Sequence, residues 1–294
     1  MTSSEIRQAA IDAGFDLAGI CRVDGPFASH GPFQRWIEAG FHAGMDYLPR
    51  QVPIRQSLDA VLSGAKSALV VALNYRQPNP TQPRVAQYAL NRDYHRVFRR
   101  RLRPVVARLE AAFPEAAFRI CVDSAPVYER ELAVRAGLGW LGKNTLLINP
   151  HQGSFLLLAS VLTTAEWQAG EAFQAHHCGT CQRCIEACPT GALVQLEGRW
   201  QLDARRCISY WTIEHRGDLP SDVETHGWAF GCDICQEVCP HNSPRPARAQ
   251  PTEDPDFLAR PDWPDFATMT EEEWDRWSAG SPIARCVSPI TRPG

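Results

Sequence analysis

The chain has 294 residues, of which 44% are hydrophobic, so a folded core is expected and global disorder is excluded. Its formal net charge of -3 gives the whole molecule no electrostatic preference for nucleic acid or membrane, so any polyanion must meet a local patch. The polar N-terminus has no signal-peptide core or twin-arginine signal, and no apolar run approaches about 18 residues, so a soluble, cytoplasmic protein is expected.

Residues 1–165 predict a first domain in which helices and strands alternate. Helices are expected over Ser3–Ala13, Asp93–Phe113 and Tyr128–Ala136, with Pro104 as a kink or break in the second. Short, apolar, β-rich runs predict buried strands at Ser67–Leu73, Phe118–Val122 and Phe155–Val161.

Asp123 is the best acid/base candidate because it follows one of these strands and precedes a helix. The carboxyl ends of strands are where α/β folds place ligands, and a carboxyl in such a cleft can hold a proton near neutral pH. The residues alone favour another interpretation, in which Asp123 or Ser124 merely caps the helix.

The segment from Arg92 to Arg108 contains seven arginines and one acid. On a helix with one apolar face, such a segment is usually a solvated surface, but it can also be a phosphate-binding patch. Both interpretations remain open at this point.

Cysteine is the most informative residue, because eight of the eleven lie between Cys178 and Cys239. In a reducing compartment, disulfides do not explain this density. The first motif has the spacing C-x2-C-x2-C-x3-C-P of bacterial ferredoxins, and begins at Cys178. The second has C-x2-C-x3-C-P from Cys232, with Cys207 upstream as its missing cysteine.

Two 4Fe–4S clusters with crossed ligation account for all eight cysteines, because the fourth cysteine of each motif serves the other cluster. Zinc is the alternative for closely spaced C-x2-C pairs, but the repeated ferredoxin run is more specific. Cys21, Cys121 and Cys286 are expected to be buried hydrophobes, and His176 and His177 a solvated turn. The first cluster takes Cys178, Cys181, Cys184 and Cys239, and the second takes Cys188, Cys207, Cys232 and Cys235.

The expected class is α+β, with an N-terminal α/β domain followed by a ferredoxin-like two-cluster domain over residues 166–245. Residues 246–294 are expected to form a linker and a short C-terminal segment. The tail contains Trp263, Trp274 and Trp277 among many acids, which predicts a short helical appendage.

Several strings, taken in order, resemble the epoxyqueuosine reductase family, whose members complete queuosine synthesis on tRNA. The likeness runs to about Ile283, after which the basic helical stretch usual in the family is missing. The strings are Gly64–Ser67, Val71–Tyr75, Tyr88–Ala89, Asp93–His95, Val122–Arg130, Gly137–Asn144 and Cys207–His215, together with the eight cysteines.

The resemblance implies a cob(II)alamin in the N-terminal domain, reduced through the clusters by an external flavodoxin-type, ferredoxin-type or chemical donor. It implies a monomer that removes the epoxide oxygen from epoxyqueuosine in the tRNA anticodon loop. Asp123 would be the proton donor. The resemblance also favours the interpretation of the arginine segment as a tRNA-facing surface. Residues matching the corrin contacts would be Tyr75, Arg130, Asn144, Ser209 and Tyr210.

The string Asp93-Tyr94-His95 begins like the D-x-H-x-x-G motif of histidine-ligated cobalamin, but Phe98 replaces the glycine, so no protein histidine is expected on cobalt. Three alternatives stand beside the reductase. They are a reductive dehalogenase, a non-catalytic ferredoxin-type electron carrier, and a zinc-stabilised nucleic-acid-binding module.

Overall fold

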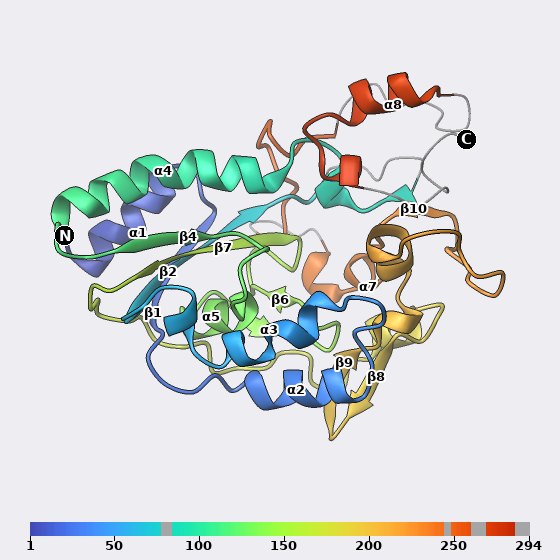
Figure 1. Ribbon diagram of the computed structural model, residues 1–294, viewed down its shortest axis with the longest axis horizontal. Helices are drawn as coiled ribbons and strands as arrows, with labels where there is room; N and C mark the ends of the chain where they lie inside the picture. Colours follow the sequence, from blue (N-terminus) through green and yellow to red (C-terminus); the bar gives the residue numbers. More distant parts are fainter. Residues whose placement is uncertain (78–83, 244–247, 260–268, 286–294) are drawn as a thin grey trace.

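A central antiparallel sheet organises the first half of the chain. The computed structural model describes residues 1–77, 84–243, 248–259 and 269–285 (Figure 1). The strand order is β1-β2-β7-β4, and every neighbouring pair is antiparallel. The strands are β1 (Leu17–Arg22), β2 (Ser67–Asn74), β7 (Leu156–Thr163) and β4 (Phe118–Cys121).

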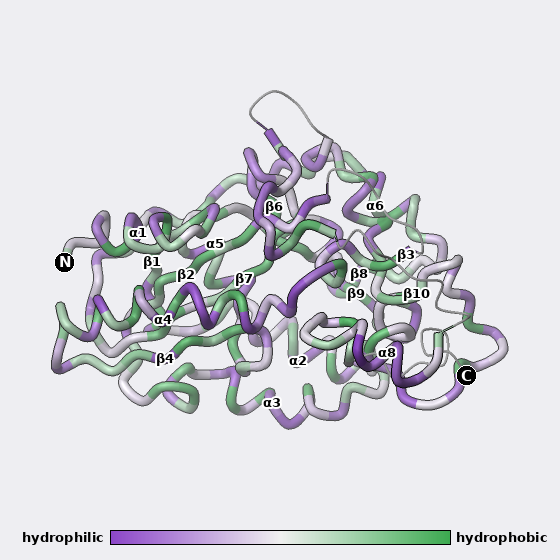
Figure 2. The backbone as a smooth tube through the Cα atoms, turned by 90° about the horizontal axis from the view of Figure 1, so that it is seen from above, coloured by the Kyte–Doolittle hydropathy of each residue, from purple (hydrophilic) through white to green (hydrophobic). Residues whose placement is uncertain are grey.

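Helices cover both faces of this sheet (Figure 1). All eight residues of β2 are buried, and its alternating side chains enter two different cores. Leu69 and Leu73 pack in the core beneath α1 and α4, whereas Val70 packs in the core beneath α5. Figure 2 shows the resulting hydrophobic centre along β2 and β7. The helices are α1 (Ser3–Asp12), α2 (His30–Glu38), α3 (Tyr47–Arg55), α4 (Tyr94–Ala112) and α5 (Glu129–Arg135).

The predicted helices and strands of this domain are confirmed to within about two residues. Helix α1 begins with a capping box formed by Thr2 and Glu5, which satisfies two of its free donors. Helix α4 continues through Pro104, so of the predicted kink or break the break is excluded. Its buried face, which includes Phe98, Leu102 and Leu109, offsets the hydrogen bond that proline removes.

Two expectations about the neighbourhood of Asp123 are wrong. Helix α5 begins at Glu129 with Tyr128 at its N-cap position, so neither Asp123 nor Ser124 caps it. The sheet is antiparallel, so the ligand-site rule for parallel α/β sheets does not apply to the end of β4.

The cysteine-rich region is built from short elements. Two one-turn helices carry part of the cysteine motifs and contact each other. The π-helix η4 begins three residues after Cys207. Its bounds are Tyr210–Glu214, and the other elements here are α6 (Arg183–Glu186), α7 (Ile234–Glu237) and the hairpin β8 (Leu193–Leu196) and β9 (Arg199–Leu202).

The described residues of the expected third segment, 248–259 and 269–285, pack against the rest of the molecule. Phe257 is buried in the core beneath α1 and α4, and Trp274 of helix α8 (Glu271–Ser278) packs with Phe230. Strand β10 (Trp228–Phe230) pairs in parallel with β3 (Arg84–Val85). The predicted short helix is therefore present, but it packs against the rest of the fold instead of standing apart from it. Trp263 and Cys286 lie outside the described residues.

The remaining elements are short. None of the helices in the described part of the chain is long and apolar enough to cross a membrane. The remaining elements are the hairpin β5 (Trp140–Leu141) and β6 (Leu147–Ile148), and the turns η1 (Leu58–Ala60), η2 (Gln87–Ala89), η3 (Ala204–Arg206), η5 (Pro240–Asn242) and η7 (Pro282–Arg285).

Candidate functional site

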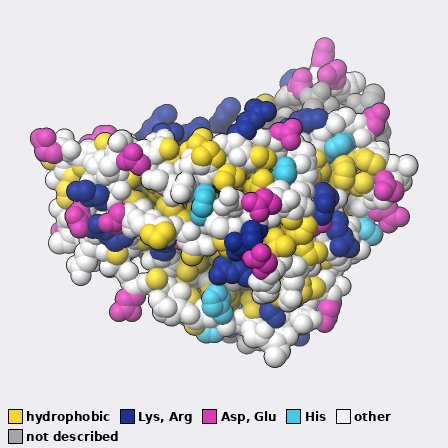
Figure 3. Space-filling view, turned by 60° about the horizontal axis from the view of Figure 1, so that its bottom comes forward, with side chains coloured by type: hydrophobic (Ala, Val, Ile, Leu, Met, Phe, Trp, Pro, Cys, Tyr) yellow, Lys and Arg dark blue, Asp and Glu magenta, His cyan; other side chains and the backbone are white. Residues whose placement is uncertain are grey.

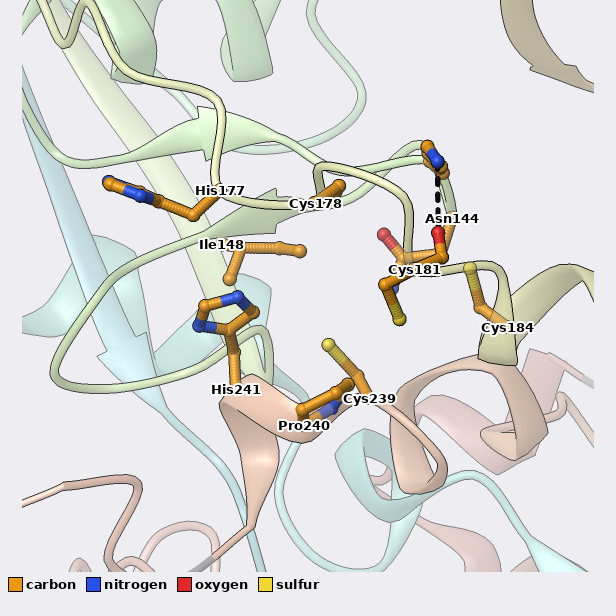
Figure 4. A pocket seen from close by; sticks show the side chains of 10 residues that line it. Asn144, Ile148, His177, Cys178, Cys181, Cys184, Cys239, Pro240 and His241 are labelled. Atoms are coloured by element: carbon orange, nitrogen blue, oxygen red, sulfur yellow. Dashed lines mark hydrogen bonds between the residues drawn. The ribbon is translucent and has the colours of Figure 1, made fainter.

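Four cysteines from the two motifs surround one cavity of about 180 Å³. Cys178, Cys181 and Cys184 come from the first motif, and Cys239 comes from the end of the second. Figure 4 shows Cys181, Cys184 and Cys239 pointing toward a common space. This grouping is the set expected for the first cluster, and four thiols around one cavity suit the donor set of a 4Fe–4S cluster.

The other four cysteines interact electrostatically with one another, and they form the set expected for the second cluster. Burial raises the pKa of Cys232 to about 12, and the charges of Cys207 and Cys188 add to this effect. Burial also raises the pKa of Cys235, with Cys232 among its charged neighbours. The second expected set therefore also lies together, although its members span residues 188–235.

Burial makes the thiolate form of several cysteines unfavourable without a compensating cation. Desolvation raises the pKa of Cys184 to about 11, and repulsion from Cys239, Cys178 and Cys181 contributes. The backbone N–H of Ala192 donates to Cys188 Sγ at 3.3 Å, as amides do at iron–sulfur sites, where such bonds tune the potential. A metal cluster would stabilise the deprotonated thiols that this arrangement gathers.

The sequence placed His177 next to the first motif only as a solvated turn, and it did not single out Lys143 or His241 at the first cysteine set. His177 and His241 both line its cavity and both pack edge-on against buried Trp140, at 4.8 Å between ring centroids. His177 is exposed, but it is more than a solvated turn. Lys143 Nζ donates to the carbonyls of Gly179 and Cys181 at 2.8 and 2.9 Å, and so ties the first motif to the β5–β6 hairpin.

Asp123 lies just beyond β4 in a left-handed backbone conformation, with φ of 53°. Its side chain is 57% exposed, and its Oδ2 lies 3.4 Å from Nε2 of buried His95. The other imidazole nitrogen, Nδ1, lies 2.7 Å from Asp93 Oδ1. Asp93 also caps α4 by accepting the backbone N–H of His95 at 3.0 Å. The imidazole therefore bridges a fixed carboxylate and the candidate acid.

Two further groups surround Asp123. Burial raises the pKa of Tyr94, and the charge of Asp123 and a hydrogen bond to it reinforce this effect. The backbone N–H of Asp123 donates to Glu129 Oε1 at 2.8 Å. Neither His95 nor Glu129 was predicted to act here, although both stand in strings that carried the family resemblance.

Three of the five expected corrin contacts are buried and bound to protein groups. Tyr75 exchanges hydrogen bonds with Gln236, one of them at 3.0 Å. The hydroxyl of Tyr210 accepts the backbone N–H of Gly44 at 3.0 Å. Asn144 donates to the carbonyl of Cys235 at 3.5 Å and lines the first cysteine cavity, so it lies between the two cysteine sets.

The remaining two, Arg130 and Ser209, reach solvent. Arg130 donates to the carbonyl of Thr145, and desolvation by surrounding protein lowers its pKa. A ligand can therefore reach this cation although it is not freely hydrated. Arg130 and Ser209 are thus the two expected corrin contacts that a bound molecule could approach from solvent.

The arginine segment divides into two parts. Arg101 pairs with Asp254 and Asp256 at 2.7 Å, and Arg92 and Arg100 also pair with Asp256. Arg96, Arg99, Arg103 and Arg108 are exposed on α4. Figure 3 shows basic side chains along the upper edge, on the side where α4 lies.

Fold and site together define a redox protein in which a two-cluster ferredoxin module is joined to an α+β domain. Residues 177–242 match the family model for a 4Fe-4S double cluster binding domain. Residues 55–124 match the model described as "Epoxyqueuosine reductase QueG, DUF1730". An epoxyqueuosine reductase from Synechococcus sp. (strain RCC307) is 43% identical over 284 residues, which are 93% of this chain and 85% of that protein. The chain therefore belongs to the epoxyqueuosine reductase family, whose members are oxidoreductases.

Solved structures agree with this assignment. A selenomethionine-labelled epoxyqueuosine reductase has a TM-score of 0.82 with 26% identity, and the match covers 98% of this chain and 78% of that chain. Another, solved with a tRNA-Tyr epoxyqueuosine-modified stem loop, has a TM-score of 0.79 with 26% identity, over 96% and 78% of the two chains. A catabolic reductive dehalogenase has a TM-score of 0.51 with 18% identity, which is a likeness of fold alone.

Proposed function

We propose that this chain reduces the epoxide of epoxyqueuosine at the wobble position of tRNA and so produces queuosine. The observation that carries the proposal is the solvent-open carboxyl of Asp123, held beside a buried imidazole in a molecule that also gathers eight cysteines in two sets. Removing an epoxide oxygen as water and leaving a carbon–carbon double bond consumes two electrons and two protons. The cysteine module suits the supply of electrons, and the Asp123 site suits the supply of protons.

The eight cysteines would hold two 4Fe–4S clusters with crossed ligation, as the shared cavity of Cys178 and Cys239 supports. A cobalamin would lie in the domain over residues 1–165, with Arg130 and Ser209 as its solvent-reachable contacts and Tyr75, Asn144 and Tyr210 as a buried frame. When bound, cobalamin would supply low-potential reducing equivalents to the substrate.

Asp123 would deliver a proton to the departing epoxide oxygen. A general acid must lie within hydrogen-bonding reach of the atom that it protonates, and an exposed side chain beyond a strand end permits such an approach. His95 would orient the Asp123 carboxyl, because Asp93 fixes the imidazole from its other side. Tyr94 would donate to the same carboxyl and limit its rotation.

The tRNA phosphates would be bound by the exposed arginines of α4, and the wobble base would be splayed from its loop to reach Asp123. An external donor of the flavodoxin or ferredoxin type would deliver electrons to the clusters, since both cysteine sets contain partly exposed members. The protein would act as a monomer, with domains over residues 1–165 and 166–245 and a C-terminal segment over 246–294.

The test is an anaerobic reaction of the reconstituted protein with an epoxyqueuosine-containing stem loop, read by mass spectrometry of the nucleosides. We expect queuosine to form only when cobalamin and a reductant are both added. Reduction of the clusters without nucleoside conversion would favour a ferredoxin-type carrier instead.

A further inference from the structure

Glu129 is a partly buried acid whose position the proton-donor role of Asp123 does not explain. It is the first residue of α5, and its Oε1 accepts the backbone N–H of Asp123 at 2.8 Å. Asp123 has φ of 53°, a conformation that non-glycine residues seldom adopt and that costs free energy unless neighbouring groups hold it. The bond from Glu129 spans six residues and closes the turn between β4 and α5.

Desolvation favours the protonated form of Glu129, because burial raises its pKa to about 8. The negative charge of Asp123 also raises this pKa, whereas the N–H of Asp123 and the cations Arg55 and Arg130 lower it. A protonated carboxyl retains acceptor capacity, so the bond from the N–H of Asp123 does not depend on a charge on Glu129.

We propose that Glu129 is a positioning residue that holds Asp123 in its left-handed turn by accepting the backbone N–H of that residue. This inference rests on the proposed role of Asp123 as proton donor. Glu129 acts through Asp123, because its carboxyl is bound to the backbone of that residue and α5 fixes its own backbone.

Two substitutions test this anchor. Glu129→Ala removes the acceptor, so hydrogen exchange of the peptide over residues 122–127 should accelerate by about tenfold, the equivalent of one net hydrogen bond. Glu129→Gln keeps an acceptor oxygen and the side-chain shape, so its exchange should stay near that of the wild-type protein.

Glu131→Ala is the matched control, because Glu131 also lies on α5 and accepts backbone N–H groups, but from Ala28 and Ser29. It should accelerate exchange around those residues and leave the 122–127 peptide unchanged. Exchange is measured without substrate, so it tests the anchor even if the chain fails to reduce epoxyqueuosine. Unchanged exchange in Glu129→Ala, or exchange in Glu129→Gln as fast as in Glu129→Ala, would overturn the positioning role.

Discussion

At the scale of single residues, the candidate acid is one member of a chain of polar contacts. Asp93, His95 and Asp123 come from two segments that meet where α4 begins and β4 ends. The sequence identified Asp123 by its place after an apolar strand, and this placement is confirmed. It could not identify His95 or Glu129 as neighbours, because their contacts depend on how the turn folds back and no spacing rule describes a left-handed turn.

Asp123→Asn should lower the single-turnover rate by about 100- to 10,000-fold, the usual contribution of a general acid, because an amide cannot supply the proton. Binding of the stem loop should change little, since Asn keeps the size of the side chain. A fluorescence anisotropy titration and a rapid-quench assay measure the two effects. A rate within threefold of wild type would remove Asp123 from the proposed mechanism.

Asp93→Asn tests the orientation of His95 without destroying the helix cap, because Asn caps helices as well as Asp does. The substitution replaces the charged acceptor of His95 Nδ1, and hydrogen bonds to charged groups contribute about 1.5–3 kcal/mol, so the rate should fall about 10- to 100-fold. The melting temperature should stay close to that of the wild-type protein. A variant that loses stability but retains its rate would show that Asp93 is only a cap.

At the scale of secondary-structure elements, the C-terminal segment is part of the folded body. Thr270 and Glu273 form a capping box that starts α8, and Trp274 is 1% exposed against Val85 and Phe230. The sequence predicted a short helix here from its tryptophans, but hydropathy alone could not show which residues Trp274 contacts. The same limit applies to Pro104, where local propensity predicted a kink or break but the helix continues because one face of α4 is buried.

Trp274→Ala should lower the free energy of unfolding by about 3 kcal/mol or more, because it removes a fully buried aromatic side chain. Thermal unfolding followed by circular dichroism measures the change. Asp275→Ala on the exposed face of the same helix is the control and should change stability by less than about 0.5 kcal/mol. Equal effects of the two variants would mean that α8 contributes no core packing.

At the scale of the whole molecule, cysteine spacing predicted more of the candidate site than any other feature. A motif with fixed gaps dictates which thiols can share a cluster, so the set around the first cavity could be named from the sequence. The corrin contacts could not be derived in this way. Tyr75 and Tyr210 engage Gln236 and Gly44, partners separated from them by more than a hundred residues.

Crossed ligation predicts different iron contents for matched pairs of substitutions. Cys178→Ala with Cys239→Ala removes two ligands from one cluster, so iron should fall from about eight to about four atoms per chain. Cys178→Ala with Cys188→Ala removes a ligand from each cluster, so most of the iron should be lost. Iron analysis of anaerobically purified protein distinguishes these outcomes, and the reverse pattern would show that each motif binds its own cluster.

The central claim is that this chain makes queuosine, and nucleoside analysis of cellular tRNA tests it most directly. In a bacterium that lacks its own epoxyqueuosine reductase and is supplied with cobalamin, expression of this chain should convert epoxyqueuosine in tRNA to queuosine, whereas Asp123→Asn should not. Retention of epoxyqueuosine in cells that contain the folded protein with about eight irons per chain would contradict the account.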